Sequence, residues 1–315
     1  MPDGGPGGRS TALIGVDWGT TNLRAYRLAA DGQILERAES AHGILALPPG
    51  GFAEALSALV EPWRRDAPAA PMLLSGMVGS QQGWREAPYV ALPAGPAEIA
   101  SALVPLPEAG DRAALVPGLI DRSGVPDVIR GEETQILGLP PDPDGDGSMP
   151  ADGVVCLPGT HSKWARIESG QVTRFATFMT GELHALLGAH GILAKTLEAE
   201  EQEVDDAAFA AGLERAAQPG GLTHHLFGLR GSVLDGVLEA GHGAAYLSGL
   251  VIGHELLGAR ALLGPVERVT LVGARGPVAR WRTALARCGV ASDLAPPDIA
   301  AAGLYRLARM GGVLT

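Results

Sequence analysis

The first strong pattern in the chain is an apolar run at residues 12–16 that ends in a carboxylate, Asp17. A polar turn of sequence Gly-Thr-Thr-Asn follows at 19–22, and apolar and polar residues then alternate over 23–28. This order predicts a strand, a tight turn and a second strand. Consecutive backbone N–H groups and small hydroxyls in such a turn can bind an anion. A plain hairpin is the alternative if the stretch is taken alone.

A second stretch of the same kind lies about 140 residues further along the chain. Residues 153–157 are an apolar strand that runs into the turn Gly-Thr-His-Ser at 159–162, and a strand pattern resumes at 164–167. We name residues 19–22 the first turn and residues 159–162 the second turn. Two such hairpins, each opening one half of the chain, predict a duplicated fold whose halves face each other across a nucleotide.

The segments between and after the hairpins predict both strands and helices. Helical spacing of apolar residues marks the amphipathic helices, and short apolar or alternating runs mark the strands. In the helix that begins near 179, Thr180 is a candidate cap, and in the helix from 277 we expect Trp281, Leu285 and Cys288 to face inward. The expected strands are 33–38, 72–77 and 171–178, and residues 267–276 are expected to form a strand that leads into a glycine-containing turn. The expected helices are 52–60, 179–187, 244–263 and two that start at 277 and 297.

The composition limits what the protein can bind. Its 315 residues, of which 46% are apolar, are enough for two domains with separate cores. The formal net charge of −11 argues against nucleic acid, whose phosphates require a basic face. No apolar run reaches the ~20 residues of a membrane helix, so we expect no membrane partner either. Two distant cysteines and a first segment without an apolar core predict a reducing, cytoplasmic location.

A polar loop follows the expected strand at 72–77. It runs over 78–85 and carries two amides and an indole, Trp84, among glycines. Loops at strand ends are where open α/β sheets usually place ligand groups. Amides and an aromatic face suit a polyhydroxy substrate, because they offer donors, acceptors and a flat apolar surface. The alternative is a surface turn in which Trp84 anchors the loop to the core.

An acidic helix start precedes the second hairpin. Gly131 is followed by Glu132, Glu133 and an apolar run, which predicts a helix with two acidic residues in its first turn. The helix dipole favours carboxylates at that place, so a capping role is one interpretation. A functional role, which would rest on the position of these residues in the chain, is the other. Separately, Asp17 at the end of the first strand is well placed to hold Mg²⁺ through water.

In this combination and order, these stretches resemble the actin-like ATPase superfamily that includes the sugar kinases. Within it, residues 13 to about 308 resemble the 2-keto-3-deoxygalactonate kinase family, most specifically at SGMVGS (75–80), RGEET (130–134) and PGTHSKW (158–164). The resemblance implies an α/β fold of two actin-like (ribonuclease H-like) domains. Each domain would hold a mixed five-stranded sheet flanked by helices, with a cleft between the domains.

The resemblance also implies a domain organisation. We expect a disordered tail at 1–10, an N-terminal actin-like domain at 11–140, a linker at 141–152 and a C-terminal actin-like domain at 153–296. A terminal helix at 297–315 is expected to pack back toward the N-terminal domain. The Asp-rich run within the linker imitates the start of a calcium loop, but Gly153 stands where such a loop needs its glutamate, which favours a linker.

The activity that the resemblance implies is an ATP- and Mg²⁺-dependent phosphorylation of the 6-hydroxyl of 2-dehydro-3-deoxy-D-galactonate. Two other activities stay open: a related kinase for another sugar or sugar acid, and a non-kinase actin-like nucleotide-binding protein. The expected partner is a small sugar acid, and a homodimer stays open. Which cation meets the substrate carboxylate is also open among Arg24, Arg85, Arg130 and Lys163.

Site residues follow from the resemblance position by position. In sugar kinases of this superfamily the carboxylate that opens the helix before the second turn is the general base. We therefore expect Glu132 to be the base, with Glu133 as second choice, and Asp17 to be catalytic mainly as the metal residue. The expected nucleotide contacts are Gly19, Thr20, Thr21, Asn22, Gly159, Thr160, His161, Ser162, Gly273 and Ala274, and the expected substrate contacts are Met77, Gly79, Ser80, Gln81, Trp84, Arg130, Glu133 and Lys163.

Overall fold

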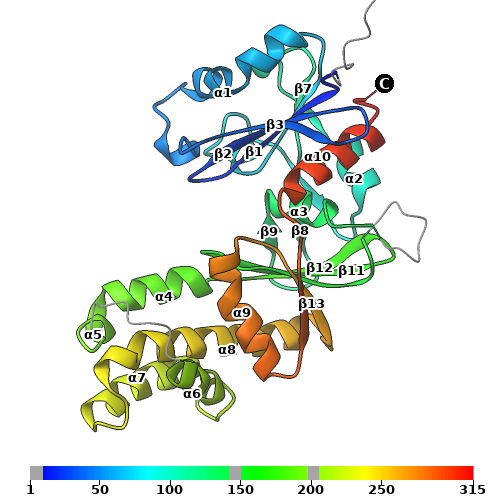
Figure 1. The fold of residues 1–315 in the computed structure, drawn as a ribbon. Coiled ribbons are helices and arrows are strands. Elements are labelled where there is room, and N and C mark those ends of the chain that lie inside the picture. Colours follow the sequence, from blue (N-terminus) through cyan, green and yellow to red (C-terminus); the bar gives the residue numbers. More distant parts are fainter. Residues whose placement is uncertain (1–9, 142–149, 198–205, 315) are drawn as a thin grey trace, which may run out of the picture. The chain divides into compact units, whose positions relative to one another are not determined.

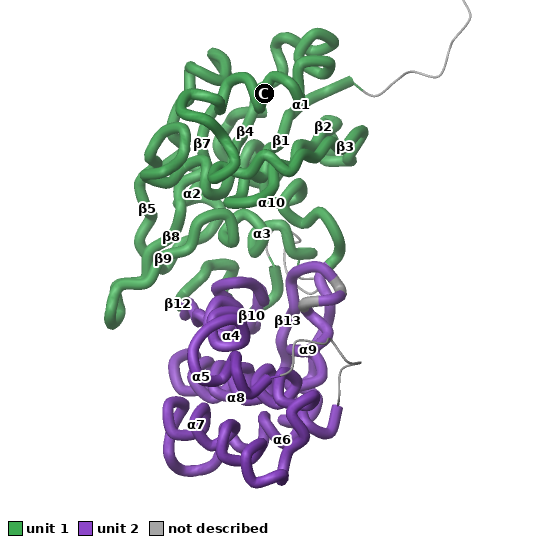
Figure 2. The backbone as a smooth tube through the Cα atoms, turned by 90° about the vertical axis from the view of Figure 1, so that its left-hand side faces the viewer, with its two compact units in different colours: residues 1–152, 167–174, 296–315 green, residues 153–166, 175–295 purple. Residues whose placement is uncertain are grey.

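A computed structural model describes residues 10–141, 150–197 and 206–314 of the chain (Figure 1). The chain divides into two compact units, shown in different colours in Figure 2. Unit 1 comprises residues 1–152, 167–174 and 296–315, and unit 2 comprises residues 153–166 and 175–295. Most of the expected tail and linker lies outside the described residues.

Unit 1 is built on a six-stranded mixed sheet. Its order is β3-β2-β1-β4-β7-β6, with β1 antiparallel to β2 and parallel to β4. We expected five strands, and the sixth is the two-residue β6, which pairs antiparallel with β7 at the edge. The strands are β1 Leu13–Trp18, β2 Leu23–Leu28, β3 Ile34–Ser40, β4 Met72–Ser75, β6 Val104–Pro105 and β7 Ala113–Leu115.

The alternating side-chain directions along β1 show which helix covers each face of this sheet. Val16 and Trp18 join the buried cluster that includes Leu56 of α1 (Phe52–Asp66). A Cβ added at Gly15 would lie 3.0 Å from Leu304 of α10 (Ile299–Met310). Since successive residues of a strand point to opposite faces, α1 and α10 cover opposite faces of the sheet.

Unit 1 also holds a three-stranded sheet and shorter helices. The sheet has the order β5-β8-β9, with β5 Tyr89–Ala91, β8 Gly118–Asp121 and β9 Asp127–Ile129. The short helices are α2 Pro96–Ser101, α3 Glu132–Leu137 and the 3₁₀ turns η1 Ile44–Ala46, η2 Met77–Gly79 and η3 Pro107–Ala109.

Unit 2 contributes to a five-stranded sheet of order β12-β11-β10-β13-β14, in which β10 and β13 are parallel. The strands are β10 Gly153–Leu157, β11 Ser162–Glu168, β12 Gln171–Phe178, β13 Arg268–Leu271 and β14 Ala291–Leu294. The helices are α4 Thr180–Ala189, α5 Gly191–Ala194, α6 Asp206–Ala216, α7 Gly221–Leu234, α8 Gly243–Leu263 and α9 Arg275–Arg287, with the 3₁₀ turn η4 Ala240–His242.

One buried carboxylate connects a strand and two helices in unit 2. Glu255 of α8 accepts hydrogen bonds at 2.7 Å from the indole N–H groups of Trp164 in β11 and Trp281 in α9. Burial raises the pKa of Glu255, because a charged carboxylate loses its hydration there. The expected inward orientation of Trp281 follows from this bond.

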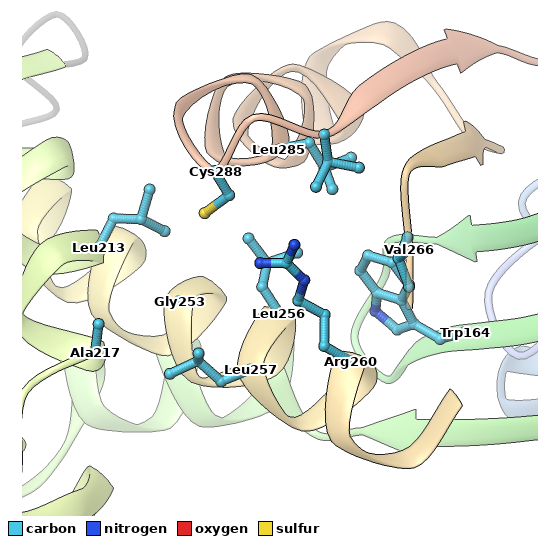
Figure 3. Close-up of a pocket in the computed structure, with 11 residues that line it drawn as sticks. Trp164, Leu213, Ala217, Gly253, Leu256, Leu257, Arg260, Val266, Leu285 and Cys288 are labelled. Carbon is cyan, nitrogen blue, oxygen red and sulfur yellow. The ribbon is translucent and has the colours of Figure 1, made fainter. Parts of the chain in front are cut away.

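The expectation for Cys288 was wrong. Leu285 is buried as expected, but α9 ends at Arg287, so Cys288 lies beyond its last turn and is exposed. Its side chain borders a small, mainly apolar cavity of about 60 Å³ that is lined also by Trp164 and Arg260 (Figure 3). The cap expected at Thr180 was wrong as well, because Thr180 is the first residue of α4 and Met179 precedes it as the cap position, without a side-chain hydrogen bond.

No helix among the described residues is both long enough and apolar enough to cross a membrane.

The contact between α3 and α10 depends on glycine. A Cβ at Gly303 of α10 would lie 1.9 Å from the carbonyl oxygen of Thr134, so the two backbones could not keep their present distance. We predict that Gly303→Ala lowers the free energy of unfolding by about 1–3 kcal/mol, as other overpacked sites do. Chemical denaturation of the purified protein measures this.

The control is the same substitution where there is room. Gly188 lies exposed in α4 with no atom within 4 Å of its added Cβ, so Gly188→Ala should raise the free energy of unfolding by up to about 1 kcal/mol. Equal effects of the two substitutions would contradict the close approach of α3 and α10.

Candidate active site

The backbone of the first turn is hydrogen-bonded to residues 43–45. The turn closes through Gly19 N–H to the carbonyl of Asn22 at 2.9 Å. The carbonyls of Gly19, Thr20 and Thr21 accept hydrogen bonds from residues 43–45 at 3.1–3.3 Å. Among the described residues, the N–H groups of Thr20 and Thr21 donate no main-chain hydrogen bond, and both residues are exposed. Two backbone donors and two hydroxyls are therefore available to an anion.

Asp17 lies where three segments of unit 1 meet. It pairs in register with Ser75, the last residue of the parallel strand β4. Gly76 then turns the chain at φ +94°, and Gly131, at φ +104°, approaches it so closely that an added Cβ would lie 3.1 Å from the Gly76 Cα. Both conformations favour glycine. The start of α3 is thereby held beside the ends of β1 and β4.

The two glutamates at the start of α3 differ in environment. Glu132 is half-buried, and its carboxylate accepts the backbone N–H of Arg130 at 3.0 Å. Glu133 has no exposed surface, and its two oxygens accept the N–H of Gly131 at 2.6 Å and the hydroxyl of Thr134 at 3.1 Å. Of the two, only Glu132 keeps a surface that a substrate can reach.

The acidic groups of this region shift one another's protonation. Burial raises the pKa of Asp17 to about 6; the positive charge of Arg24 opposes the rise and the negative charge of Glu132 adds to it. Burial raises the pKa of Glu133 to about 7, and the charge of Glu132 contributes in the same direction. Glu132 is thus close enough to both carboxyls to act on them electrostatically.

The expected substrate loop forms η2 and the turn after it. Gly79 is buried against Arg130, and the Ser80 hydroxyl donates to the Met77 carbonyl at 2.7 Å. Gln81 is exposed. Trp84 is stacked on Phe52, with ring centroids 5.8 Å apart, and packs against the buried cluster of the sheet. This geometry favours the anchoring role that the sequence left open for the indole.

The second turn is held by the start of α4. Glu182 donates its backbone N–H to the Thr160 carbonyl at 2.9 Å, and its carboxylate is hydrogen-bonded to the ring Nε2 of His161. Lys163 donates to the His161 carbonyl at 2.8 Å. Ser162 is fully buried, with its hydroxyl beside the buried carboxylate of Glu255. The exposed residues of the turn are Gly159, Thr160 and His161.

A cavity of about 480 Å³ opens beside the second turn, within unit 2. Arg280 of α9 donates to the Ser248 hydroxyl at its wall at 2.8 Å, and the ring Nε2 of His184 is buried there without a partner among the described residues. Burial lowers the pKa of His184, so its neutral form is favoured. The lining residues are Gly159, Thr160, Thr180, Gly181, His184, Ser248, Val251, Ile252, Gly276, Arg280 and Trp281.

The expected adenosine residues lie at the same edge of the sheet as the second turn. Val272 donates its N–H to the Cys156 carbonyl at 2.8 Å, which aligns the ends of β13 and β10. An added Cβ at Gly273 would lie 4.0 Å from the Pro158 carbonyl oxygen, just before the second turn. Gly273 and Ala274 precede α9, whose Gly276 and Arg280 line the cavity.

The expected site residues therefore form two groups, one in each unit. Asp17, the first turn, the loop at 77–84 and residues 130–133 gather in unit 1. The second turn, Gly273 and Ala274 gather in unit 2, which also holds Lys163, the one expected substrate contact outside unit 1. Among the described residues, no cluster of three or more His, Cys, Asp or Glu is arranged to hold a metal ion.

Sequence reasoning missed three side chains of the unit 2 cavity, namely His184, Ser248 and Arg280. The sequence contained one indication of them, a spacing of four residues. Thr180 and His184 have this spacing in α4, and Gly276 and Arg280 have it in α9. Residues at that spacing share one helix face. Which face would border the second turn could not be known without the packing of α4 and α9 on α8.

Each half of the molecule thus joins a sheet to a glycine-containing turn after its first strand, and one half adds a carboxylate at a helix start. The fold is that of the actin-like sugar kinases. The chain belongs to the 2-keto-3-deoxy-galactonokinase family, whose sequence model matches residues 17–307. The expected family and fold class are confirmed.

Relatives agree with this assignment. The chain is 40% identical over 300 residues to a protein of Rhizobium meliloti (strain 1021) named as a probable 2-dehydro-3-deoxygalactonokinase, covering 93% of this chain and 95% of that one. It is 35% identical over 277 residues to the 2-dehydro-3-deoxygalactonokinase of Escherichia coli (strain K12), covering 88% and 90%.

Solved structures agree as well. A crystal structure from Sinorhizobium meliloti that bears the same kinase name superposes with a TM-score of 0.83 at 38% identity, covering 94% of this chain and 98% of the other. The gluconate kinase of Lactobacillus acidophilus shares the fold alone, with a TM-score of 0.54 at 8% identity and coverage of 96% and 89%.

The buried carboxyl of Glu133 predicts a pH dependence of stability. Its pKa is raised from the ordinary 4.5 to about 7, so the folded protein binds this proton more tightly than the unfolded chain does. The resulting stabilisation is complete below about pH 4.5 and is lost as the pH rises through about 7. Glu133→Gln, which carries no such proton, should reduce the fall in unfolding free energy between pH 5 and pH 8 by up to about 3 kcal/mol.

Denaturant titrations at several pH values measure this dependence. Glu86→Gln serves as control, because Glu86 is exposed and its loss should leave the pH slope unchanged. The same slope for wild type and Glu133→Gln would refute the buried, shifted carboxyl.

Proposed function

We propose that the protein transfers the terminal phosphoryl group of ATP to the 6-hydroxyl of 2-dehydro-3-deoxy-D-galactonate, forming 2-dehydro-3-deoxy-6-phosphogalactonate. Membership of the kinase family supports the reaction and the substrate class. The observation that carries the proposal is the position of Glu132, half-buried at the start of α3 and within electrostatic reach of Asp17 beside the first turn. Because such a reaction consumes ATP, we place it in the cytoplasm.

Glu132 is the proton acceptor in this proposal. Its carboxylate is held by the Arg130 N–H at 3.0 Å, and it retains solvent contact from which it can reach an acceptor hydroxyl. Phosphoryl transfer requires a protein mainly to position the reactants and to stabilise charge. The base removes the proton from the attacking hydroxyl. Glu133, without exposed surface, fixes the helix start through Gly131 and Thr134.

The two turns bind the phosphates of one nucleotide in this proposal. In the first turn, the N–H groups and hydroxyls of Thr20 and Thr21 donate to the phosphate oxygens, with Gly19 and Asn22 at its ends. In the second turn, Gly159, Thr160 and His161 offer exposed groups, whereas Ser162 is buried. The unit 2 cavity beside the second turn, with Arg280 in its wall, accepts the nucleoside part near Gly273 and Ala274.

A magnesium ion fits the residues present. Mg²⁺ prefers oxygen ligands and keeps much of its water, so one carboxylate together with ATP phosphates suffices to hold it. Asp17 is the residue that we assign to it, and its carboxyl is ionised above about pH 6. The ion neutralises charge on the phosphates during the transfer.

A direct assay tests the proposed reaction. The protein is incubated with Mg-ATP and 2-dehydro-3-deoxy-D-galactonate beside a panel of other sugar acids and neutral sugars, and products are identified by mass and by phosphorus NMR. We expect a phosphate on carbon 6 of the named acid. Efficient phosphorylation of another acceptor would replace the substrate, and slow ATP hydrolysis that no acceptor stimulates would favour a non-kinase nucleotide-binding protein.

Removal of the proton acceptor should slow the chemical step. We predict that Glu132→Gln lowers kcat by about 10²–10⁴-fold, the usual range for general-base catalysis, with little change in nucleotide affinity. Steady-state kinetics and calorimetric titration with a non-hydrolysable ATP analogue measure the two effects. Glu54→Gln, at an exposed position of α1, is the control and should keep wild-type turnover, whereas unchanged turnover in Glu132→Gln would rule out its assigned role.

The cavity in unit 2 predicts a second kinetic effect. Arg280 is part of its wall and Arg282 lies exposed on the same helix, so the two form a matched pair. Loss of one charge-assisted hydrogen bond corresponds to about tenfold in affinity. Arg280→Met should therefore raise the KM for ATP about tenfold, while Arg282→Met leaves it unchanged. The assignment of the cavity to the nucleoside fails if both variants keep the wild-type KM.

A further inference from the structure

Arg130 in unit 1 carries a buried charge that lacks a full set of partners. The residue is only 8% exposed. Its Nη2 donates to the Ala87 carbonyl at 2.7 Å, and its guanidinium lies over the Tyr89 ring, 4.3 Å from the ring centre. Its Nε and Nη1 are buried and have no hydrogen-bond partner among the described residues. Together these two nitrogens carry three N–H donors.

Unpaired donors on a buried guanidinium indicate that a ligand binds there. Leaving buried donors unpaired is costly, more so on a charged group, and native proteins rarely do it without a functional reason. A guanidinium cannot lower this cost by losing its proton, because its pKa is far above the physiological range. The group that would complete it is an anion, and carboxylates suit arginine donors well.

A glycine, and no side chain, stands next to the guanidinium of Arg130. Gly79 approaches the guanidinium so closely that an added Cβ would lie 3.0 Å from Nη1. Glycine at 79 therefore keeps a side chain away from one of the two unpaired nitrogens. Gly79 belongs to η2, at the start of the loop that we assign to the substrate.

The other candidate cations are engaged elsewhere. Arg85 is exposed and forms an ion pair with Glu108. Arg24 lies 3.8 Å from a carboxylate oxygen of Glu39, and Lys163 donates to the His161 carbonyl. Arg130 combines burial with unpaired donors, and its own backbone N–H holds Glu132, the proposed proton acceptor.

We propose that Arg130 binds the carboxylate of the sugar acid and is the residue that makes the enzyme select acids over neutral sugars. This inference rests on the proposed function. The backbone of residue 130 orients the base while its side chain binds the far end of the substrate, so one short segment fixes both the reacting hydroxyl and the carboxylate.

Binding measurements test the role of Arg130 without depending on turnover. The ligands are 2-dehydro-3-deoxy-D-galactonate and its uncharged carboxamide, each titrated by calorimetry into protein saturated with a non-hydrolysable ATP analogue. We expect wild type to prefer the acid by at least about 30-fold, the usual effect of one buried charge pair. Arg130→Gln should lose that preference and bind the amide within about threefold of wild type. Arg130→Lys, which keeps the charge, should retain part of it.

Two further variants separate binding from folding. Arg122→Gln, at an exposed position, is the control and should keep the wild-type preference. Gly79→Ala, which places a methyl group against Nη1, should weaken binding of the acid more than of the amide, and it replaces Arg130→Gln if that variant does not fold. Equal affinity of wild type for acid and amide, or an equal loss of both in the variants, would overturn the role of Arg130. Absence of turnover with normal acid binding would instead refute the proposed reaction.

Discussion

In both units, the positions of the expected site residues depend on where neighbouring parallel strands end. In unit 1, β1 and β4 end together at Asp17 and Ser75, and in unit 2, β10 and β13 end together near Cys156 and Leu271. Carboxyl ends of parallel strands collect loops at one edge of the sheet, so turns and helix starts that are distant in sequence become neighbours there. The expected site residues of each unit lie at such an edge.

The acidic residues at the end of β1 and at the start of α3 limit how unit 1 can bind a nucleotide. Glu132 lies within electrostatic reach of both Asp17 and Glu133 in a protein of net charge −11, and burial raises the pKa of the latter two. Such a cluster repels the phosphates of a nucleotide unless cations and N–H donors compensate. The first turn and a bound Mg²⁺ would supply that compensation in the function that we propose.

Much of the fold could be predicted from the local sequence pattern. The environment of several site residues could not, because it depends on contacts between elements that are distant in the sequence. Both hairpins, the helix start at Glu132 and the strand at 171–178 follow from alternation, turn residues and acidic residues in a first helical turn. The burial of Glu133 and the stacking of Trp84 on Phe52 depend on neighbours from other elements. The unpaired state of Arg130 is likewise a property of its surroundings, and the same residue on a surface would bind only water.

In the function that we propose, both turns bind the same nucleotide, and calorimetric titration with a non-hydrolysable ATP analogue measures whether they do. Proline at Thr21 or at Thr160 removes one backbone donor from the first or the second turn. We expect one nucleotide per chain and a weaker affinity at that single site in each variant. Two independent sites, or a normal affinity in either variant, would contradict it.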